Sequence, residues 1–165
     1  MPSAREERIR EIVSRLPPGR DGGNFARKRP GLALGVLFLR QAEAEFEGEA
    51  GLLAATSARR TIDREDYIEH GVPYIPAEAR FSNIIRKVRS DGRSGSIMNS
   101  AMDSIEAENE NLRDALPGGY EQAGESELAV FLEYVAGLDM DRHRDVFREA
   151  YELITGGHYD RQCQE

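Results

Sequence analysis

Basic side chains are concentrated between residues 80 and 93, where a single acid, Asp91, accompanies them. Guanidinium groups match the geometry of phosphate oxygens, and the Gly-Ser sequence at residues 90–95 predicts a turn that can follow a nucleic-acid backbone. The alternative interpretation is a solvated helix face whose charge balances acids elsewhere in the chain. The candidate phosphate-binding residues are Arg80, Arg86, Lys87, Arg89 and Arg93.

A second basic cluster, Arg27-Lys28-Arg29, lies in residues 20–30, which we expect to form a Gly-rich loop. Arg27, Lys28 and Arg29 are therefore further candidates for phosphate contact, with a solvated loop as the alternative. Arg80 has an alternative of its own, because pairing with Glu78 or capping a helix would keep it from DNA.

No combination of residues in the sequence predicts catalysis or a metal site. Three His and one Cys give no recognisable Ser/His/Asp or Cys/His arrangement. The acids around Asp139 and Asp141 lack the glycine and the closing glutamate of a calcium loop, and acids are favourable at the start of a helix. His158, Asp160 and Cys163 are interpreted as part of a tail rather than as metal ligands. We expect no catalytic, cofactor-binding or metal-binding residue in this chain.

The composition is that of one folded domain without a membrane span. The chain has 165 residues, 39% of them hydrophobic, and no run of about 18 apolar residues. The charged N-terminal stretch differs from a signal peptide, and the single Cys163 cannot form an internal disulfide, so we expect a cytoplasmic protein.

The charge is divided unevenly along the sequence. Residues 1–102 hold 17 Lys and Arg against 14 Asp and Glu, whereas residues 103–165 hold 5 against 16. The total of −8 argues against general nucleic-acid binding, although a local basic patch can still serve a phosphate backbone.

Apolar residues recur with helical spacing through most of the chain, and confident strand patterns are nearly absent. The sequence predicts an all-α, irregular helical bundle of about six to eight helices. We expect one domain, residues 1–165, divided into an N-terminal helix and basic loop (1–30), a helical core (31–154) and a tail (155–165). Residues 63–74 should form a loop that leads into an extended, proline-containing segment at 71–76. Helices are expected near residues 4–16, 31–55, 76–85, 97–105, 128–135 and 146–154.

Residues 101–120 carry the clearest local signals. They read Ala-Met-Asp-Ser-Ile-Glu-Ala-Glu-Asn-Glu-Asn-Leu-Arg-Asp-Ala-Leu-Pro-Gly-Gly-Tyr. Because Asn is a favourable helix N-cap and Pro-Gly a terminator, we expect a helix, a break at 109–111, a second short helical piece and a stop at 117–119.

This segment resembles the N-terminal helical domain of the modification (methylation) subunit of type I restriction-modification systems. That family has the pattern Ala-Met-x-x-Ile-Glu-x-Glu-Asn-x-x-Leu-x-x-x-Leu-Pro-x-x-Tyr. Residues 74–82 resemble its Tyr/Phe-x-Val-Pro-x-Glu-Ala-Arg-Trp sequence, and residues 31–46 and 146–154 resemble its first and last core helices. The matching residues of the first pattern are Ala101, Met102, Ile105, Glu106, Glu108, Asn109, Leu112, Leu116, Pro117 and Tyr120.

The resemblance implies an accessory domain of an adenine-specific DNA methyltransferase. It implies packing on a catalytic methyltransferase domain, contact with a specificity subunit and help in closing around double-stranded DNA. In that family the catalytic part flips the adenine out of the duplex and methylates it from S-adenosylmethionine.

The catalytic domain of that family needs sequence features that this chain lacks. The chain has no Asn-Pro dipeptide for an Asn-Pro-Pro-Tyr/Phe loop, and its Gly156-Gly157 follows a helix rather than a strand. It also lacks the family's Trp in the first helix. By itself it should neither hold S-adenosylmethionine nor methylate DNA.

A stand-alone helical protein–protein interaction module is the other function that the sequence fits. Such a module would use its acidic C-terminal half against a basic partner and would have no role with DNA. A small enzyme of unrelated chemistry is a third alternative, and no catalytic constellation supports it.

Overall fold

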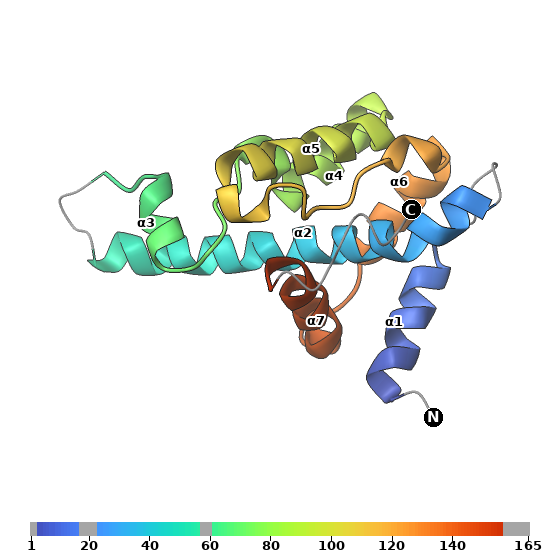
Figure 1. Ribbon diagram of the computed structural model, residues 1–165, viewed down its shortest axis with the longest axis horizontal. Helices are drawn as coiled ribbons and strands as arrows, with labels where there is room; N and C mark the ends of the chain where they lie inside the picture. Colours follow the sequence, from blue (N-terminus) through green and yellow to red (C-terminus); the bar gives the residue numbers. More distant parts are fainter. Residues whose placement is uncertain (1–2, 17–22, 57–60, 157–165) are drawn as a thin grey trace.

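The computed structural model describes residues 3–16, 23–56 and 61–156, which form helices joined by short connections (Figure 1). No strand occurs in these ranges, so the all-α prediction is confirmed. The 3-10 helices are η1 (Ala77–Ala79), η2 (Glu110–Leu112) and η3 (Tyr120–Gln122). The α-helices are α1 (Ala4–Ser14), α2 (Gly23–Thr56), α3 (Arg64–Glu69), α4 (Phe81–Asp91), α5 (Ser94–Glu108), α6 (Glu125–Ala136) and α7 (Arg144–Thr155).

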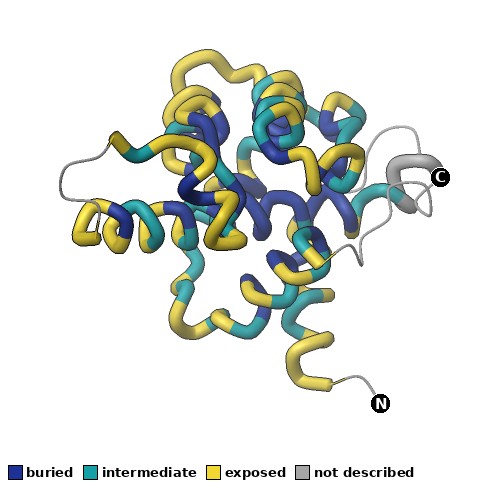
Figure 2. The backbone as a smooth tube through the Cα atoms, turned by 60° about the vertical axis from the view of Figure 1, so that its left-hand side comes forward, coloured by how far each residue is buried: buried dark blue, intermediate teal, exposed yellow. Residues whose placement is uncertain are grey.

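Helix α2 is the central element, and other helices pack on opposite sides of it (Figure 1). Its apolar run from Leu32 to Leu39 is buried on nearly every face, as expected for a core helix. Its last turns are largely exposed, and α2 there extends past the bundle with only α3 beside it (Figures 1 and 2). No helix in the described part of the chain is long and apolar enough to cross a membrane.

A loop was predicted at residues 20–30. For the described residues from Gly23 onward this prediction is wrong, because α2 begins at Gly23 and contains Pro30. An interior proline lacks an N–H and costs a helix about 3 kcal/mol. Burial of the apolar residues that follow Pro30 stabilises the helix enough to offset this cost. Local helix propensity alone would end the helix at the proline.

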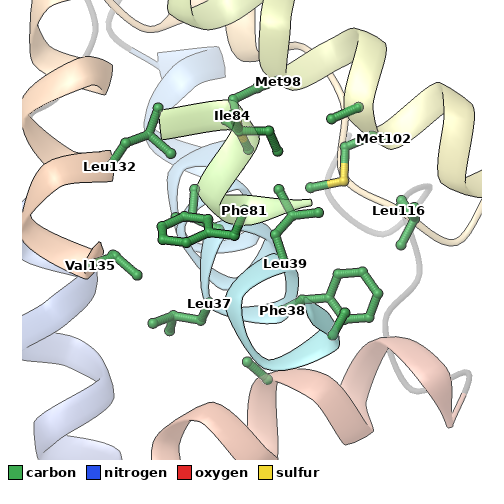
Figure 3. Close-up of a cluster of buried hydrophobic side chains, with 14 of the residues drawn as sticks. Leu37, Phe38, Leu39, Phe81, Ile84, Met98, Met102, Leu116, Leu132 and Val135 are labelled. Carbon is green, nitrogen blue, oxygen red and sulfur yellow. The ribbon is translucent and has the colours of Figure 1, made fainter. Parts of the chain in front are cut away.

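Helices α4, α5 and α6 pack together over the same side of α2 (Figure 3). Phe81 and Ile84 of α4 lie in this cluster with Leu132 of α6 and Leu39 of α2, and all four are buried. The core therefore joins segments from both halves of the sequence.

Residues 63–74 were expected to form a loop, and this prediction is wrong in its first part, because α3 occupies Arg64–Glu69. The Asp63 carboxylate accepts from the Asp66 N–H, and the Asp66 carboxylate accepts from the Asp63 N–H. This reciprocal capping box satisfies N–H groups that a short helix would otherwise leave open. A helix expected from Pro76 onward is divided instead, with η1 at Ala77–Ala79 and α4 starting at Phe81.

The extended segment predicted at residues 71–76 is confirmed, and Asn109 holds it in place. The Asn109 side chain accepts from the Tyr74 N–H and donates to the Tyr74 carbonyl, both over 2.8 Å. Its Nδ2 also donates to the Ile105 carbonyl over 2.8 Å. One buried amide thus ties the end of α5 to a strand-like segment that has no sheet partner in the described ranges.

Residues 101–120 follow the prediction in outline: α5 ends at Glu108, a second short helical piece follows, and the chain turns before Tyr120. The expected break at 109–111 is shorter, because η2 already begins at Glu110, and the Asn109 side chain does not cap η2. Tyr120 is fully buried, and its hydroxyl donates to the Leu32 carbonyl over 2.8 Å. A Cβ on Gly35 would lie 2.2 Å from that hydroxyl, so the glycine makes room for the tyrosine against α2.

Helices α1 and α7 lie together on the other side of α2 and are joined by ion pairs. Arg5 contacts Glu149 over 3.0 Å, and Arg8 contacts Asp145. Asp145 and Glu149 of α7 are thus paired with arginines of α1. Residues 157–165, the expected tail with His158, Asp160 and Cys163, lie outside the described residues.

Candidate nucleic-acid interface

Helix α4 presents the main basic cluster because its apolar residues fix its orientation. Phe81, Ile84, Ile85 and Val88 face the core, which leaves the side chains of residues 86, 87 and 89 in solvent. The period of 3.6 residues makes this separation possible within eleven residues.

Both ends of α4 are held in position. At its start, the Glu43 carboxylate accepts from the Ser82 N–H over 3.1 Å and from the Ser82 hydroxyl over 2.6 Å. A carboxylate at this end of a helix also interacts favourably with the helix dipole. At its end, Gly92 adopts the left-handed conformation at φ 74°. The basic face of α4 therefore rests on a fixed scaffold.

The exposed cations of this cluster differ in their partners. Arg86 donates to the Asn83 side chain, a neutral group, over 2.5 Å. Arg89 binds both carboxylate oxygens of Glu133, on α6, over 2.6 and 2.8 Å. Lys87 and Arg93 are exposed and have no side-chain partner within the described residues.

The contact between Arg89 and Glu133 stabilises both charged forms. It raises the pKa of Arg89 and lowers the pKa of Glu133, in each case chiefly through the hydrogen bonds between the two side chains. Sequence reasoning missed Glu133, since the two residues are 44 positions apart and no local spacing connects them.

Arg80 lies apart from the exposed cluster. Its Nε donates to the Ile75 carbonyl over 3.2 Å, and its guanidinium carbon lies 4.8 Å from the centre of the Phe46 ring. It is half-buried and holds the extended segment against α2 through these contacts. The structure thus places Arg80 in a supporting position, with Ile75 rather than the anticipated Glu78 as its partner.

The Gly-Ser loop expected to follow a nucleic-acid backbone is almost absent. Only Gly92 and Arg93 lie between α4 and α5, and Ser94 and Gly95 are buried in the first turn of α5. The Ser94 hydroxyl donates to the Glu125 carbonyl over 2.7 Å. A Cβ on Gly95 would lie 3.0 Å from the Tyr120 carbonyl oxygen, so this glycine permits close packing inside the protein.

The second basic cluster is only partly described. The side chain of Arg27 lies outside the described residues, whereas Lys28 and Arg29 are half-buried on α2. The Lys28 ammonium lies close to Gly119, because a Cβ added to this glycine would be 3.8 Å from the Lys28 Nζ. Since Gly95 contacts the adjoining Glu121 backbone, the turn at 119–121 lies between Lys28 and the start of α5.

Acids border this same end of the molecule. Glu121, Glu125 and Glu127 are exposed around the start of α6. Their charge opposes a polyanion next to the cations of α4, which limits the attraction that the basic cluster can exert.

A separate cavity of about 780 Å³ lies between α3 and the end of α5. It combines Glu65, Glu108 and Glu110 with Arg64 and Arg113, so it has no single charge sign to attract an anion. Arg64 is already held by Glu65 and Glu108 over 2.8 and 3.2 Å. No group of His, Cys, Asp and Glu in the described ranges has the geometry of a metal site.

The model of the HsdM N-terminal domain family matches residues 32–129. The chain belongs to this family. The HsdM N-terminal domain is the N-terminal domain of the methyltransferase subunit of type I restriction-modification systems. The matched range runs from the buried start of α2 into α6 and includes the whole of α4, but not the cluster at residues 27–29. No curated protein and no solved structure matches the chain.

Proposed function

We propose that this HsdM N-terminal domain helps to clamp double-stranded DNA and to assemble a type I restriction-modification methyltransferase. The observation that carries the DNA role is the exposed basic face formed by α4 and the adjoining Arg93. Lys87 of α4 and Arg93 have no side-chain partner among the described residues. Arg86 and Arg89 extend this face, so a run of phosphates has several cations to contact.

The chemistry of the face favours phosphate contact without recognition of sequence. Arginine and lysine side chains bind phosphate oxygens, while the side chains that pair with adenine edges, Asn and Gln, are absent from its exposed part. Asn83 belongs to α4 but is already bound to Arg86 and to the Ala77 carbonyl. The domain would therefore strengthen binding at every site alike.

Binding by the isolated domain should be weak. The chain carries a formal charge of −8, and Glu133 and Asp91 lie next to the cations of α4. Useful affinity would come when a catalytic domain and a specificity subunit hold the DNA and bring α4 to the backbone. Assembly with those partners is part of the proposal, and membership of the HsdM N-terminal domain family supports it.

The decisive experiment compares two triple variants of equal charge. In the first, Arg86, Lys87 and Arg89 are replaced by Ala. In the control, Ala replaces Arg10, Arg113 and Arg142, three exposed arginines without a side-chain partner in the described part of the chain. DNA binding is titrated by fluorescence anisotropy at two salt concentrations, with and without the catalytic and specificity subunits.

We expect the first variant to weaken binding to unrelated duplexes equally. It should also reduce the slope of log K against log salt by up to about 0.9 for each phosphate that the variant no longer neutralises. Equal salt slopes in the two variants would contradict a DNA role for α4 and would favour the protein–protein interaction module instead.

A further inference from the structure

One cation on the basic face of α4 is already bound by a carboxylate of the same protein. Among its exposed cations in the described structure, Arg89 alone is bound to an acid, Glu133. The contact is bidentate, and the two side chains are 64% and 45% exposed. Burial therefore does not force this pairing, and water has access to both partners.

A carboxylate and a phosphate offer a guanidinium the same kind of oxygen pair. The Glu133 carboxylate occupies the Nε and Nη2 donors of Arg89, which are the donors that a phosphate would use in a bidentate contact. A phosphate that reaches Arg89 must either displace Glu133 or accept its negative charge as a close neighbour.

We propose that Glu133 is an internal competitor for DNA phosphate at Arg89 and lowers the affinity of the α4 face. This inference rests on the proposed DNA role of the domain. Release of Glu133 needs only a side-chain movement, since α4 and α6 remain joined by buried apolar residues such as Ile84 and Leu132 (Figure 3). The exchange of one anion for another leaves the fold unchanged.

The helix that carries Glu133 also provides a matched control. Glu127 lies on α6, is exposed, and has no cationic partner in the described ranges. Glu133→Gln and Glu127→Gln change the net charge equally and preserve side-chain size. A difference between them therefore reports the contact with Arg89 and not the general loss of negative charge.

The test measures binding of the full chain, assembled with its catalytic and specificity subunits, to a labelled duplex by fluorescence anisotropy. We expect Glu133→Gln to bind DNA about two- to fivefold more tightly than Glu127→Gln at low salt, the range of exposed ion-pair energies expressed as affinity. Its salt slope should be steeper by up to about 0.9, since Arg89 then neutralises one more phosphate.

A second pair of variants separates this mechanism from simple repulsion. In an Arg89→Ala background, the advantage of Glu133→Gln over Glu127→Gln should disappear, because no guanidinium remains to be released. Equal affinities of the two glutamine variants, or an advantage that survives without Arg89, would overturn the inference and leave the DNA role intact. Whether α4 binds DNA at all is tested separately, by comparing the salt slopes of the two triple variants described above.

Discussion

Individual arginines in this domain divide into two kinds according to their surroundings. Arg80 lies over an aromatic ring, and Arg40 donates to the carbonyls of Val135 and Leu138 at the end of α6, each over 2.6 Å. Burial lowers the pKa of Arg40, and these carbonyls compensate for the water it has lost. Arg86 and Arg93 remain in solvent. Residue type alone does not distinguish a structural arginine from one available to a phosphate.

The sharpest residue-scale prediction concerns Asn109, whose amide forms three hydrogen bonds while 1% exposed. Asn109→Ala leaves the Tyr74 N–H and carbonyl without their partner. We expect a loss of about 3 kcal/mol in the free energy of unfolding, measured by urea denaturation.

Asn111 is the matched control, because it is exposed and its side chain forms no hydrogen bond in the described structure. Asn111→Ala should change stability by less than about 0.5 kcal/mol. Similar losses in the two variants would mean that Asn109 does not hold the extended segment.

At the scale of single elements, α2 contains glycines with opposite surroundings. A Cβ on Gly35 would lie 2.2 Å from the Tyr120 hydroxyl and 3.0 Å from Pro117, whereas a Cβ on Gly48 would meet no atom within 4 Å. Alanine favours a helix over glycine by about 1 kcal/mol at either position. Only packing can therefore make the two substitutions differ in sign.

We predict that Gly35→Ala destabilises the domain by about 1–3 kcal/mol through overpacking. Gly48→Ala should stabilise it by about 0.5–1 kcal/mol through helix propensity. Thermal or urea unfolding measures both effects. If Gly35→Ala proved as stabilising as Gly48→Ala, Tyr120 would not be locked against α2.

The sequence identified most helices at the element scale, but it misplaced the boundaries that depend on distant contacts. Periodic apolar residues predicted α5, α6 and α7, because one buried stripe is a local property of a helix. The predictions for the start of α2 and for the segment that contains α3 were wrong, because both were expected to be loops. Pro30 favours a loop locally, and only the packing of the buried residues that follow it reverses that preference. The capping box of Asp63 and Asp66, in contrast, is a local signal for α3 that the prediction overlooked.

The molecule as a whole joins both halves of a sequence whose charges differ. The net charge of residues 1–102 is positive and that of residues 103–165 strongly negative, yet the two parts share one core (Figure 3). Contacts such as Arg89 with Glu133 and Arg148 with Glu45 join them at the surface as well. Part of the acidic charge is therefore paired with basic residues, while Glu121, Glu125 and Glu127 remain exposed around the start of α6.

The prediction at this scale concerns the cofactor. The described residues form helices without the strand and Gly-rich loop that hold S-adenosylmethionine in the catalytic domain of this family, so the purified chain should not bind it. Isothermal titration calorimetry should give no binding heat, with an active methyltransferase subunit as the positive control. A stoichiometric site of micromolar affinity would contradict this expectation.

The sequence by itself determined the helical class, the buried stripes and the family of this domain, because side-chain periodicity and the pattern ending at Tyr120 are local features. It also located the basic stretch of α4. Only the tertiary structure decided which of those cations are available. Arg80 turned inward to Phe46, Arg89 met Glu133, and the Gly-Ser turn became buried in α5. Each outcome depends on a partner that lies tens of residues away or on close packing between elements, which no local spacing encodes.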